Sequence, residues 1–396
     1  MSILRKISDG VEQMSTDCFE TIHRHAYRLN EKLKFKNKRR VGIAKQFPLT
    51  QEQKDQIDEF FLKNYGQKIG YVWHQNYAAH AGKFDYRFFP ELLYIPEFEA
   101  FQNQNKAAVR MMGDKNFLPL LAKAAGVKMP RTVVSCTNGI LRDGENRIIN
   151  PEDAKELLLA QGDFFVKPSV DSCSGQGCLK VNAGTDFQVQ KNCSLNVKKI
   201  GGEGGYFQDY VAQELINCHQ SIRDIYPNSV NTFRVITYLW RDKVEVMPII
   251  IRIGQGGNFL DNAHAGGVFC AVYNDGKMGD HAVTEFNDKF VEHPDTHTIF
   301  AKHRIEHVDK VIDAAKKMHT AIPQIGVVNW DFTINEEGEA VLIESNVKNG
   351  SVWLPQMAHG VGAFGENTAE VLQWLRFMKK LKLHERGRFV HGKMNS

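Results

Sequence analysis

The chain has 396 residues, of which 42% are hydrophobic and 24% charged, and its formal net charge is +4. This length suits two or three domains, and the composition is that of a soluble globular protein. The net charge is too small to indicate a nucleic-acid-binding protein, and no apolar run of about eighteen residues predicts a membrane span.

The seven cysteines form no C-x-x-C pair and show no metal-ligand spacing. This usage fits a reducing compartment and predicts a cytoplasmic protein. We expect small-molecule partners, no nucleic acid and no integral membrane association. The basic stretch from Lys32 to Arg40 has two interpretations. It is either a surface for anionic lipid or nucleic acid, or a solvated helix end, which is favoured because no aromatic or Gly-rich binding element accompanies it.

Residues 1–110 are predicted to form an α-rich N-terminal module. Within it, the segment Thr50–Gln53 fits a capping box that opens a helix. Trp73, His74 and Asp85 lie in an aromatic-rich part of this module. They either shape a substrate pocket or belong to the core, and the core is the commoner place for such aromatic residues.

Residues 111–215 change to short strands and turns, beginning with one apolar helical pattern. Lys115 precedes this pattern, and Gly126 ends it in the position of a helix C-cap. Taken alone, Lys115 fits a surface lysine at the start of a helix. An extended segment is expected after Pro130.

A strand and a polar, Gly-containing loop follow in the same region. Lys167 ends the apolar strand, where its point charge can reach the oxygens of a phosphate. In the loop, Gly175 and Gly177 let backbone N–H groups approach an anion closely. An ordinary Gly/Ser hairpin with a surface lysine explains the same residues, because the chain contains no Walker G-x-x-x-x-G-K-[ST] motif.

Residues 216–396 contain strands with single arginines, a second polar loop and an amphipathic helix over 303–320. The loop 254–267 is rich in glycine and contains Asn262 and His264. It is interpreted either as a substrate loop, in which His264 relays a proton, or as a loop whose histidine only caps backbone groups.

Two β-forming runs, 329–335 and 341–346, flank the polar turn Glu336–Glu339 and predict a β-hairpin. Glu344 and Asn346 are two residues apart, so they share a face of their strand, and Asp331 can lie across the ladder from them. Three such oxygen donors suit Mg²⁺, which takes its remaining ligands from phosphate and water. A solvated hairpin with surface acids is the alternative.

The order of these elements resembles the ATP-grasp superfamily. The elements are a lysine before a helix, a lysine before a Gly loop, a Gln-Glu hinge at 213–216, an arginine strand at 229–238, and Asp followed by Glu-x-Asn. Several stretches are similar to its sugar-transfer-associated branch, the alpha-L-glutamate ligase-like group; they are Trp73-His74, Gly82–Glu91, Asn231–Arg234 and Asp261–Gly267. The resemblance covers roughly residues 70 to 375.

The resemblance implies an α+β ATP-grasp fold, in which two α+β subdomains sandwich ATP behind the α-rich module. Residues 111–215 would form the lid and nucleotide subdomain, and residues 216–396 the core subdomain with the metal site. It assigns to ATP a set of phosphate-, adenine- and ribose-binding residues: Lys115, Lys167, Ser174, Gly175, Gly177, Gln213, Glu214, Leu215, Ile216, and either His219 or Gln220.

The same resemblance implies catalytic roles for Arg234, Arg252, Asn262 and His264. A planar guanidinium suits the charge spread over a transferring phosphoryl group. In several members of the family an arginine lies two residues before the metal aspartate, where this chain has Asn329. Arg234 is therefore the expected substitute.

Together these features predict an ATP- and Mg²⁺-dependent carboxylate–amine ligase that forms an amide through an acyl phosphate. The family name suggests a sugar acid or amino acid as substrate, in the synthesis of surface polysaccharide. Two alternatives stay open: an ATP-grasp kinase that releases a phosphorylated product, and an ATP-binding accessory protein without ligase activity.

Overall fold

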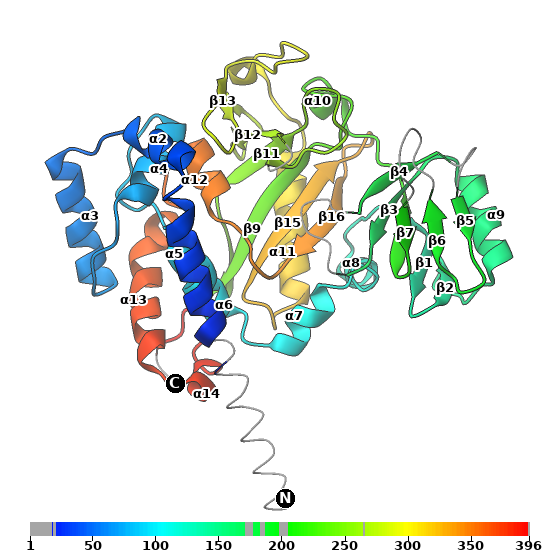
Figure 1. The fold of residues 1–396 in the computed structure, drawn as a ribbon, viewed down its shortest axis with the longest axis horizontal. Helices are drawn as coiled ribbons and strands as arrows, with labels where there is room; N and C mark the ends of the chain where they lie inside the picture. The colour runs from blue at the N-terminus through cyan, green and yellow to red at the C-terminus, as the bar shows by residue number, and fades with distance from the viewer. Residues whose placement is uncertain are drawn as a thin grey trace, which may run out of the picture.

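The computed structural model describes residues 18, 21–170, 177–182, 187–197, 205–263 and 266–394. Figure 1 shows two β-sheet units side by side, with helices from both ends of the chain grouped beside the larger one. None of the helices in these ranges is both long and apolar enough to cross a membrane.

The N-terminal module is helical, as predicted. Its capping box is confirmed: the Gln53 N–H donates to the Thr50 hydroxyl at 3.2 Å, and the Thr50 N–H donates to Gln53 Oε1 at 3.0 Å. The helical segments are residues 21–34, α2 (Lys38–Lys45), α3 (Gln51–Asn64), α4 (Val72–Ala81), α5 (Glu91–Leu93), the π-helix η1 (Tyr94–Glu99), α6 (Ala100–Gln102) and α7 (Lys106–Met112).

The smaller unit contains a five-stranded antiparallel sheet in the order β2-β1-β8-β3-β4, with a three-stranded sheet β5-β6-β7. Helix α9 and both sheets share one apolar core. The elements are β1 (Thr132–Thr137), β2 (Ile140–Asp143), α9 (Pro151–Gln161), β3 (Phe164–Pro168), β4 (Leu179–Val181), β5 (Phe187–Val189), β6 (Leu195–Val197), β7 (Gly205–Phe207) and β8 (Tyr210–Glu214).

The larger unit is an eight-stranded sheet in the order β14-β13-β12-β11-β9-β15-β16, with β10 paired to β9. Its strands are β9 (Thr232–Trp240), β10 (Lys243–Val246), β11 (Ile249–Ile253), β12 (Val268–Val272), β13 (Met278–Val283), β14 (Lys289–Phe290), β15 (Val327–Ile334) and β16 (Ala340–Asn346). The predicted hairpin is therefore β15–β16. Because β9 pairs with both β11 and β15, residues from three neighbouring strands lie together at the centre of the sheet.

Helices cover both faces of the larger sheet. On one face lie α8 (Leu118–Ala125), which ends at Gly126 in the left-handed conformation expected of a C-cap, and α11 (Val308–Ala321). The N-terminal helices and α13 (Thr368–Lys380) cover the other face through an aromatic core. The remaining short elements are α10 (Gln220–Arg223), η3 (Phe300–Lys302), α12 (Trp353–His359), η4 (Gly365–Asn367) and α14 (Leu383–Arg386).

Buried ionisable groups in these helical layers make stability depend on pH. Burial raises the pKa of Glu91 to about 8 and that of Glu99 to about 7. Burial lowers the pKa values of His74, His80 and His319 to about 4 each. Each of these groups is therefore held in its uncharged form more strongly in the folded chain than in the unfolded chain.

We expect the free energy of unfolding to be highest near pH 6.5, the ordinary pKa of histidine. Between about pH 4 and pH 6.5 the three imidazoles are protonated in the unfolded chain but not in the folded chain, so the free energy of unfolding falls as the pH is lowered. The two carboxyl groups change the free energy of unfolding in the opposite direction, but they are fewer. Above it the folded chain keeps the Glu91 proton that the unfolded chain has lost, so stability falls until about pH 8. The slope is about 1.4 kcal/mol per pH unit for one proton.

Urea unfolding at pH 6.5 and pH 8 measures this alkaline slope. Glu91→Gln removes the main titrating group and should reduce the slope to the smaller contribution of Glu99, whereas Glu52→Gln at an exposed position of α3 should leave it unchanged. A Glu91→Gln variant with the wild-type slope would contradict the assignment.

Candidate active site

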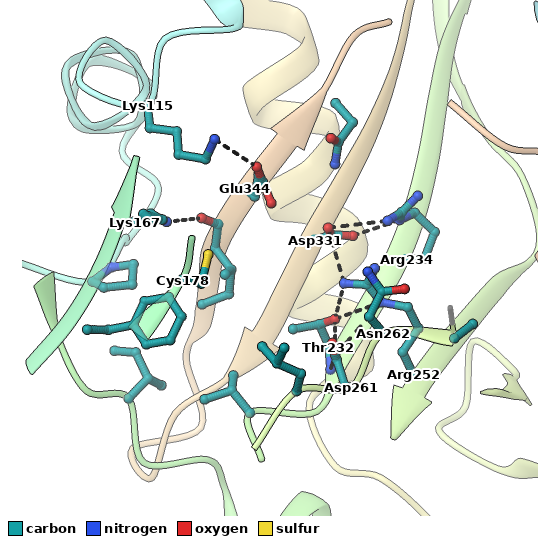
Figure 2. Close-up of a pocket in the computed structure, with 18 of the residues that line it drawn as sticks. Lys115, Lys167, Cys178, Thr232, Arg234, Arg252, Asp261, Asn262, Asp331 and Glu344 are labelled. Carbon is teal, nitrogen blue, oxygen red and sulfur yellow. Dashed lines mark hydrogen bonds and ion pairs between the residues drawn. The ribbon is translucent and has the colours of Figure 1, made fainter. Parts of the chain in front are cut away.

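A cavity of about 350 Å³ lies where the smaller sheet faces the larger one. Figure 2 shows Lys115 and Lys167 on one side of it, Arg234 and Arg252 on the other, and Asp331 and Glu344 between them. These residues come from the segment before α8 and from β3, β9, β11, β15 and β16. The site is thus assembled from both sheet units.

Asp331 and Glu344 are direct partners in the β15–β16 ladder, with an irregularity immediately after Asp331. Because side chains directly opposite each other lie on the same face of a sheet, the two carboxylates point the same way. Asn346, two residues after Glu344, also lines the cavity. The three predicted oxygen donors therefore line one cavity, and oxygen donors of these kinds can hold Mg²⁺.

Two arginines hold the Asp331 carboxylate. Arg234 donates through Nε to Oδ1 at 2.7 Å and through Nη2 to Oδ2 at 3.3 Å, and Nη2 of Arg252 lies 3.1 Å from Oδ2. Burial alone raises the pKa of Asp331, but the two guanidinium groups outweigh it and hold that pKa below its ordinary value. Asp331 is therefore an anion across the physiological pH range.

Asp261 is a buried carboxylate that the sequence interpretation did not assign to the site. Its Oδ2 accepts the Thr232 N–H at 2.9 Å and the Thr232 hydroxyl, and it lies 3.8 Å from Nε of Arg252. Arg252 also donates to the Thr232 hydroxyl oxygen, so Asp261 helps to orient Arg252 through Thr232. Asp261 directly precedes the predicted site residue Asn262, and both line the cavity. This position in the sequence could have indicated that Asp261 belongs to the site.

The two predicted phosphate lysines both line the cavity. Nζ of Lys115 lies 3.3 Å from Oε1 of Glu344, and Nζ of Lys167 donates to the Ile343 carbonyl at 3.2 Å. Burial lowers the pKa of Lys167. Both ammonium groups therefore lie at the strand that carries Glu344, where they neutralise negative charge.

The end of the cavity near β8 is apolar and includes the predicted hinge. Leu215 and Ile216 line it together with Phe165, Val230 and Ile343. The hinge backbone is fixed by its side chains. Glu214 Oε1 accepts the Arg131 N–H at 2.9 Å, and the Gln213 amide donates to the Pro130 carbonyl at 3.2 Å. This end of the cavity therefore offers an apolar surface to a ligand.

The chain leaves the cavity directly after the hinge. Gln220 does not line the cavity; its amide binds Asp224 within the α10 region. His219 does not line the cavity either. Its imidazole nitrogen lies within 4.8 Å of a carboxylate oxygen of Glu306 and an imidazole nitrogen of His307. The segment leaves the cavity because an isolated antiparallel β-bridge between the backbones of Cys218 and Asn335 holds it at the tip of the β15–β16 hairpin.

Three predicted site residues, Ser174, Gly175 and His264, lie outside the described residues. Gly177 is described and has a φ of +74°. A Cβ at this position would lie 2.8 Å from the Pro168 ring, so glycine is required there. Gly177 does not line the cavity, although its neighbour Cys178 does.

The opposite end of the cavity is formed by residues that the sequence interpretation missed. They include Lys348, Asn349 and Ser351 from the loop after β16, Trp353 at the start of α12, and Phe259 from the loop after β11. The loop after β16 directly follows Glu344 and Asn346, so its position in the sequence was the signal. In contrast, Trp73, His74 and Asp85 are buried in the N-terminal module and do not line the cavity.

The chain matches the family model described as sugar-transfer associated ATP-grasp over residues 96–371. None of the curated proteins matches the sequence significantly. Similar solved structures include a VanG D-Ala:D-Ser ligase from Enterococcus faecalis (15% identity, TM-score 0.39) and an L-amino acid ligase from Bacillus licheniformis (14%, 0.37). Another is the ATP-grasp ligase PsnB in complex with a minimal precursor (14%, 0.39).

These three alignments cover 68%, 73% and 69% of this chain, respectively. They cover 62%, 52% and 63% of the three solved chains, which is less than two thirds of each.

Proposed function

We propose that this chain, which belongs to the sugar-transfer associated ATP-grasp family, is an ATP- and Mg²⁺-dependent carboxylate–amine ligase. The observation that carries the proposal is that two lysines and two arginines surround the Asp331–Glu344 carboxylate pair in one cavity. Such an arrangement suits the transfer of a highly charged phosphoryl group.

The proposed orientation of ATP follows from the polarity of the cavity. The adenine would lie at the apolar end beside Phe165, Leu215 and Ile216, and the phosphates would extend toward Lys115 and Lys167. In this proposal residues 111–215 supply most of the nucleotide contacts. Residues 216–396 supply the metal ligands and the arginines.

Asp331, Glu344 and Asn346 would hold the magnesium ion. When bound, the ion supplies positive charge that neutralises the phosphate oxygens as they react. Within the chain, Arg234 and Arg252 keep Asp331 ionised and fix its carboxylate by three contacts, so the donor set is ordered in advance. Lys115 keeps Glu344 directed into the cavity.

The proposed reaction has two steps. A carboxylate oxygen of the substrate attacks the γ-phosphorus of ATP, the bond to the β–γ bridging oxygen breaks, and ADP leaves. The amine nitrogen then attacks the carbonyl carbon of the acyl phosphate. The C–O bond to phosphate breaks, inorganic phosphate departs with one substrate oxygen, and the amine loses a proton. The protein positions the reactants and stabilises negative charge.

The residues at the far end of the cavity suit the binding of a polar substrate that also has an apolar face. Lys348, Asn349 and Ser351 offer an ammonium, an amide and a hydroxyl, while Phe259 and Trp353 offer aromatic surface. Aromatic rings beside polar donors suit the C–H face and the hydroxyls of a sugar acid, or an amino acid with an apolar side chain. A role in surface polysaccharide synthesis is part of this proposal and follows from the family description.

A substrate screen tests the reaction class. ADP release would be measured with panels of uronic acids and amino acids, with and without amines, and the products would be identified by mass. Acid-dependent ADP release with amide formation supports the ligase. ADP release with a phosphorylated product and no amide would indicate a kinase, and no acid-dependent turnover would indicate an accessory protein.

We expect an oxygen atom to move from the substrate to phosphate during turnover. If the acid is labelled with ¹⁸O in its carboxylate, one label should appear in the released inorganic phosphate, because the C–O bond to phosphate breaks in the second step. Mass spectrometry of the phosphate measures this transfer. Label in AMP would instead demonstrate an acyl-adenylate and would contradict the proposed route.

A further inference from the structure

The loop of residues 347–352, which we name the acceptor loop, is held by the N-terminal module. Part of this loop lines the far end of the cavity, through Lys348, Asn349, Gly350 and Ser351. From the opposite side, the Asn103 amide donates to the Val347 carbonyl at 2.9 Å. A segment distant in the sequence therefore controls a wall of the proposed substrate site.

Glu99 makes the closest contacts to the acceptor loop. Its Oε1 accepts the Asn349 N–H and its Oε2 accepts the Gly350 N–H, each at 2.7 Å. The carboxyl group is buried, so these hydrogen bonds do not compete with bulk water. Both oxygens are needed, because two successive backbone donors converge on one side chain.

Two residues of the acceptor loop, Asn349 and Gly350, have special backbone requirements, and they are the two whose N–H groups donate to Glu99. Asn349 has a φ of 57°, in the left-handed region that is unfavourable for most residues. Gly350 lies against Asn329, and a Cβ on Gly350 would fall 2.0 Å from the Asn329 amide nitrogen. The loop thus combines a left-handed residue, a conformation that asparagine adopts more readily than most, with a close approach, and the Glu99 contacts hold both residues in place.

Glu91 supports the same loop through its Oε2, which accepts the Val352 N–H at 3.0 Å, and through a side-chain hydrogen bond with Ser351. Residues eight apart in a regular α-helix point about 80° away from each other. The π-helix η1, Tyr94–Glu99, lies between Glu91 and Glu99. A π-turn adds one residue, which rotates the following side chains by about 100° and so brings two residues eight apart to within about 20° of each other. The π-helix therefore accounts for both carboxyl groups facing the acceptor loop.

We propose that Glu99 is a positioning residue that fixes the acceptor loop and thereby sets the affinity for the carboxylate substrate. This inference rests on the proposed ligase function. Glu99 acts through the Asn349 and Gly350 amides and does not itself line the cavity. Nucleotide binding at the opposite end should not depend on it.

Glu99→Gln is the test variant, and Glu91→Gln is its matched control. Glutamine has one acceptor oxygen, so at position 99 one of the two N–H groups would face an NH₂ group. At position 91 glutamine still offers an oxygen to the Val352 N–H, and the Ser351 hydroxyl, which can also accept, would face the NH₂ group. A buried N–H group left without its acceptor corresponds to about tenfold to a hundredfold in an equilibrium constant.

Hydrogen–deuterium exchange of peptides covering 347–354 measures loop order without any substrate. We expect at least about tenfold faster exchange in Glu99→Gln, and a change within about twofold in Glu91→Gln. Wild-type protection of the loop in Glu99→Gln overturns the inference. If Glu99→Gln does not fold, Gly350→Ala, which disturbs the loop at Asn329, should give the same increase, and an unchanged exchange rate overturns the inference equally.

The kinetic measurement uses the acid that gives the fastest ADP release in the substrate screen. In Glu99→Gln the KM for that acid should rise about tenfold or more, while the affinity for Mg·ADP, measured by calorimetry, should stay within about twofold. An unchanged KM overturns the positioning role. Absence of turnover in the wild-type protein with every acid would instead reject the proposed function, and the exchange experiment would still decide whether Glu99 holds the loop.

Discussion

Glu344→Gln is expected to lower turnover by about two to three orders of magnitude, the size of effect seen when one preorganised electrostatic group is removed from an active site. Glu344 lies directly opposite Asp331 in the ladder, and its Oε1 is 3.3 Å from Nζ of Lys115. The neutral amide removes one of the two anionic donors proposed for Mg²⁺ and also removes the counter-ion of Lys115. Turnover would be measured as ADP release at saturating ATP over a range of Mg²⁺ concentrations.

Glu339→Gln is the matched control for this variant. Glu339 lies at the tip of the same hairpin and also pairs with a lysine, Lys128, but both side chains are about half exposed and outside the cavity. The same chemical change there should alter turnover by no more than about twofold, because exposed ion pairs contribute little. Full activity of Glu344→Gln at ordinary Mg²⁺ would refute the metal assignment. Equal loss in both variants would show that hairpin stability is being measured.

Arg234→Ala is expected to lower kcat by about two to three orders of magnitude while changing the KM for ATP by less than about threefold. Arg234 fixes Asp331 through two hydrogen bonds, and its side chain is 11% exposed, so its charge is poorly screened by solvent. Arg252 still contacts Asp331 at 3.1 Å in the variant. We therefore expect the fold and the nucleotide site to persist while charge stabilisation during transfer is lost.

Arg241→Ala tests whether loss of any arginine at this strand has the same effect. Arg241 directly follows β9, the strand of Arg234, and pairs with Glu370 at 2.9 Å on the surface. Steady-state kinetics of the two variants at saturating acid and amine should differ mainly in kcat. A wild-type kcat for Arg234→Ala would reject the proposed role, and a raised KM for ATP alone would place Arg234 in ground-state nucleotide binding.

Local features of the molecule were determined by the sequence itself. The capping box at Thr50, the C-cap at Gly126 and the β15–β16 hairpin depend on contacts between residues close in the chain. Alternation along β16 was enough to place Glu344 and Asn346 on one face. The order of the lysines, the hinge and the hairpin was also sufficient to indicate the family, because each element carries its own short pattern.

Long-range packing decided the rest of the site. No periodicity predicts that Cys218 pairs with Asn335 and so takes Gln220 away from the cavity, or that Asp261 reaches Thr232. The N-terminal module gives the clearest case. Its aromatic residues left a pocket and the core as alternatives, with the core favoured, and they are core. No pattern indicated that Glu99 reaches the acceptor loop 250 residues further along the chain. Such contacts depend on the order of the strands and on one extra residue in a helical turn, and these arise only when the whole chain is packed.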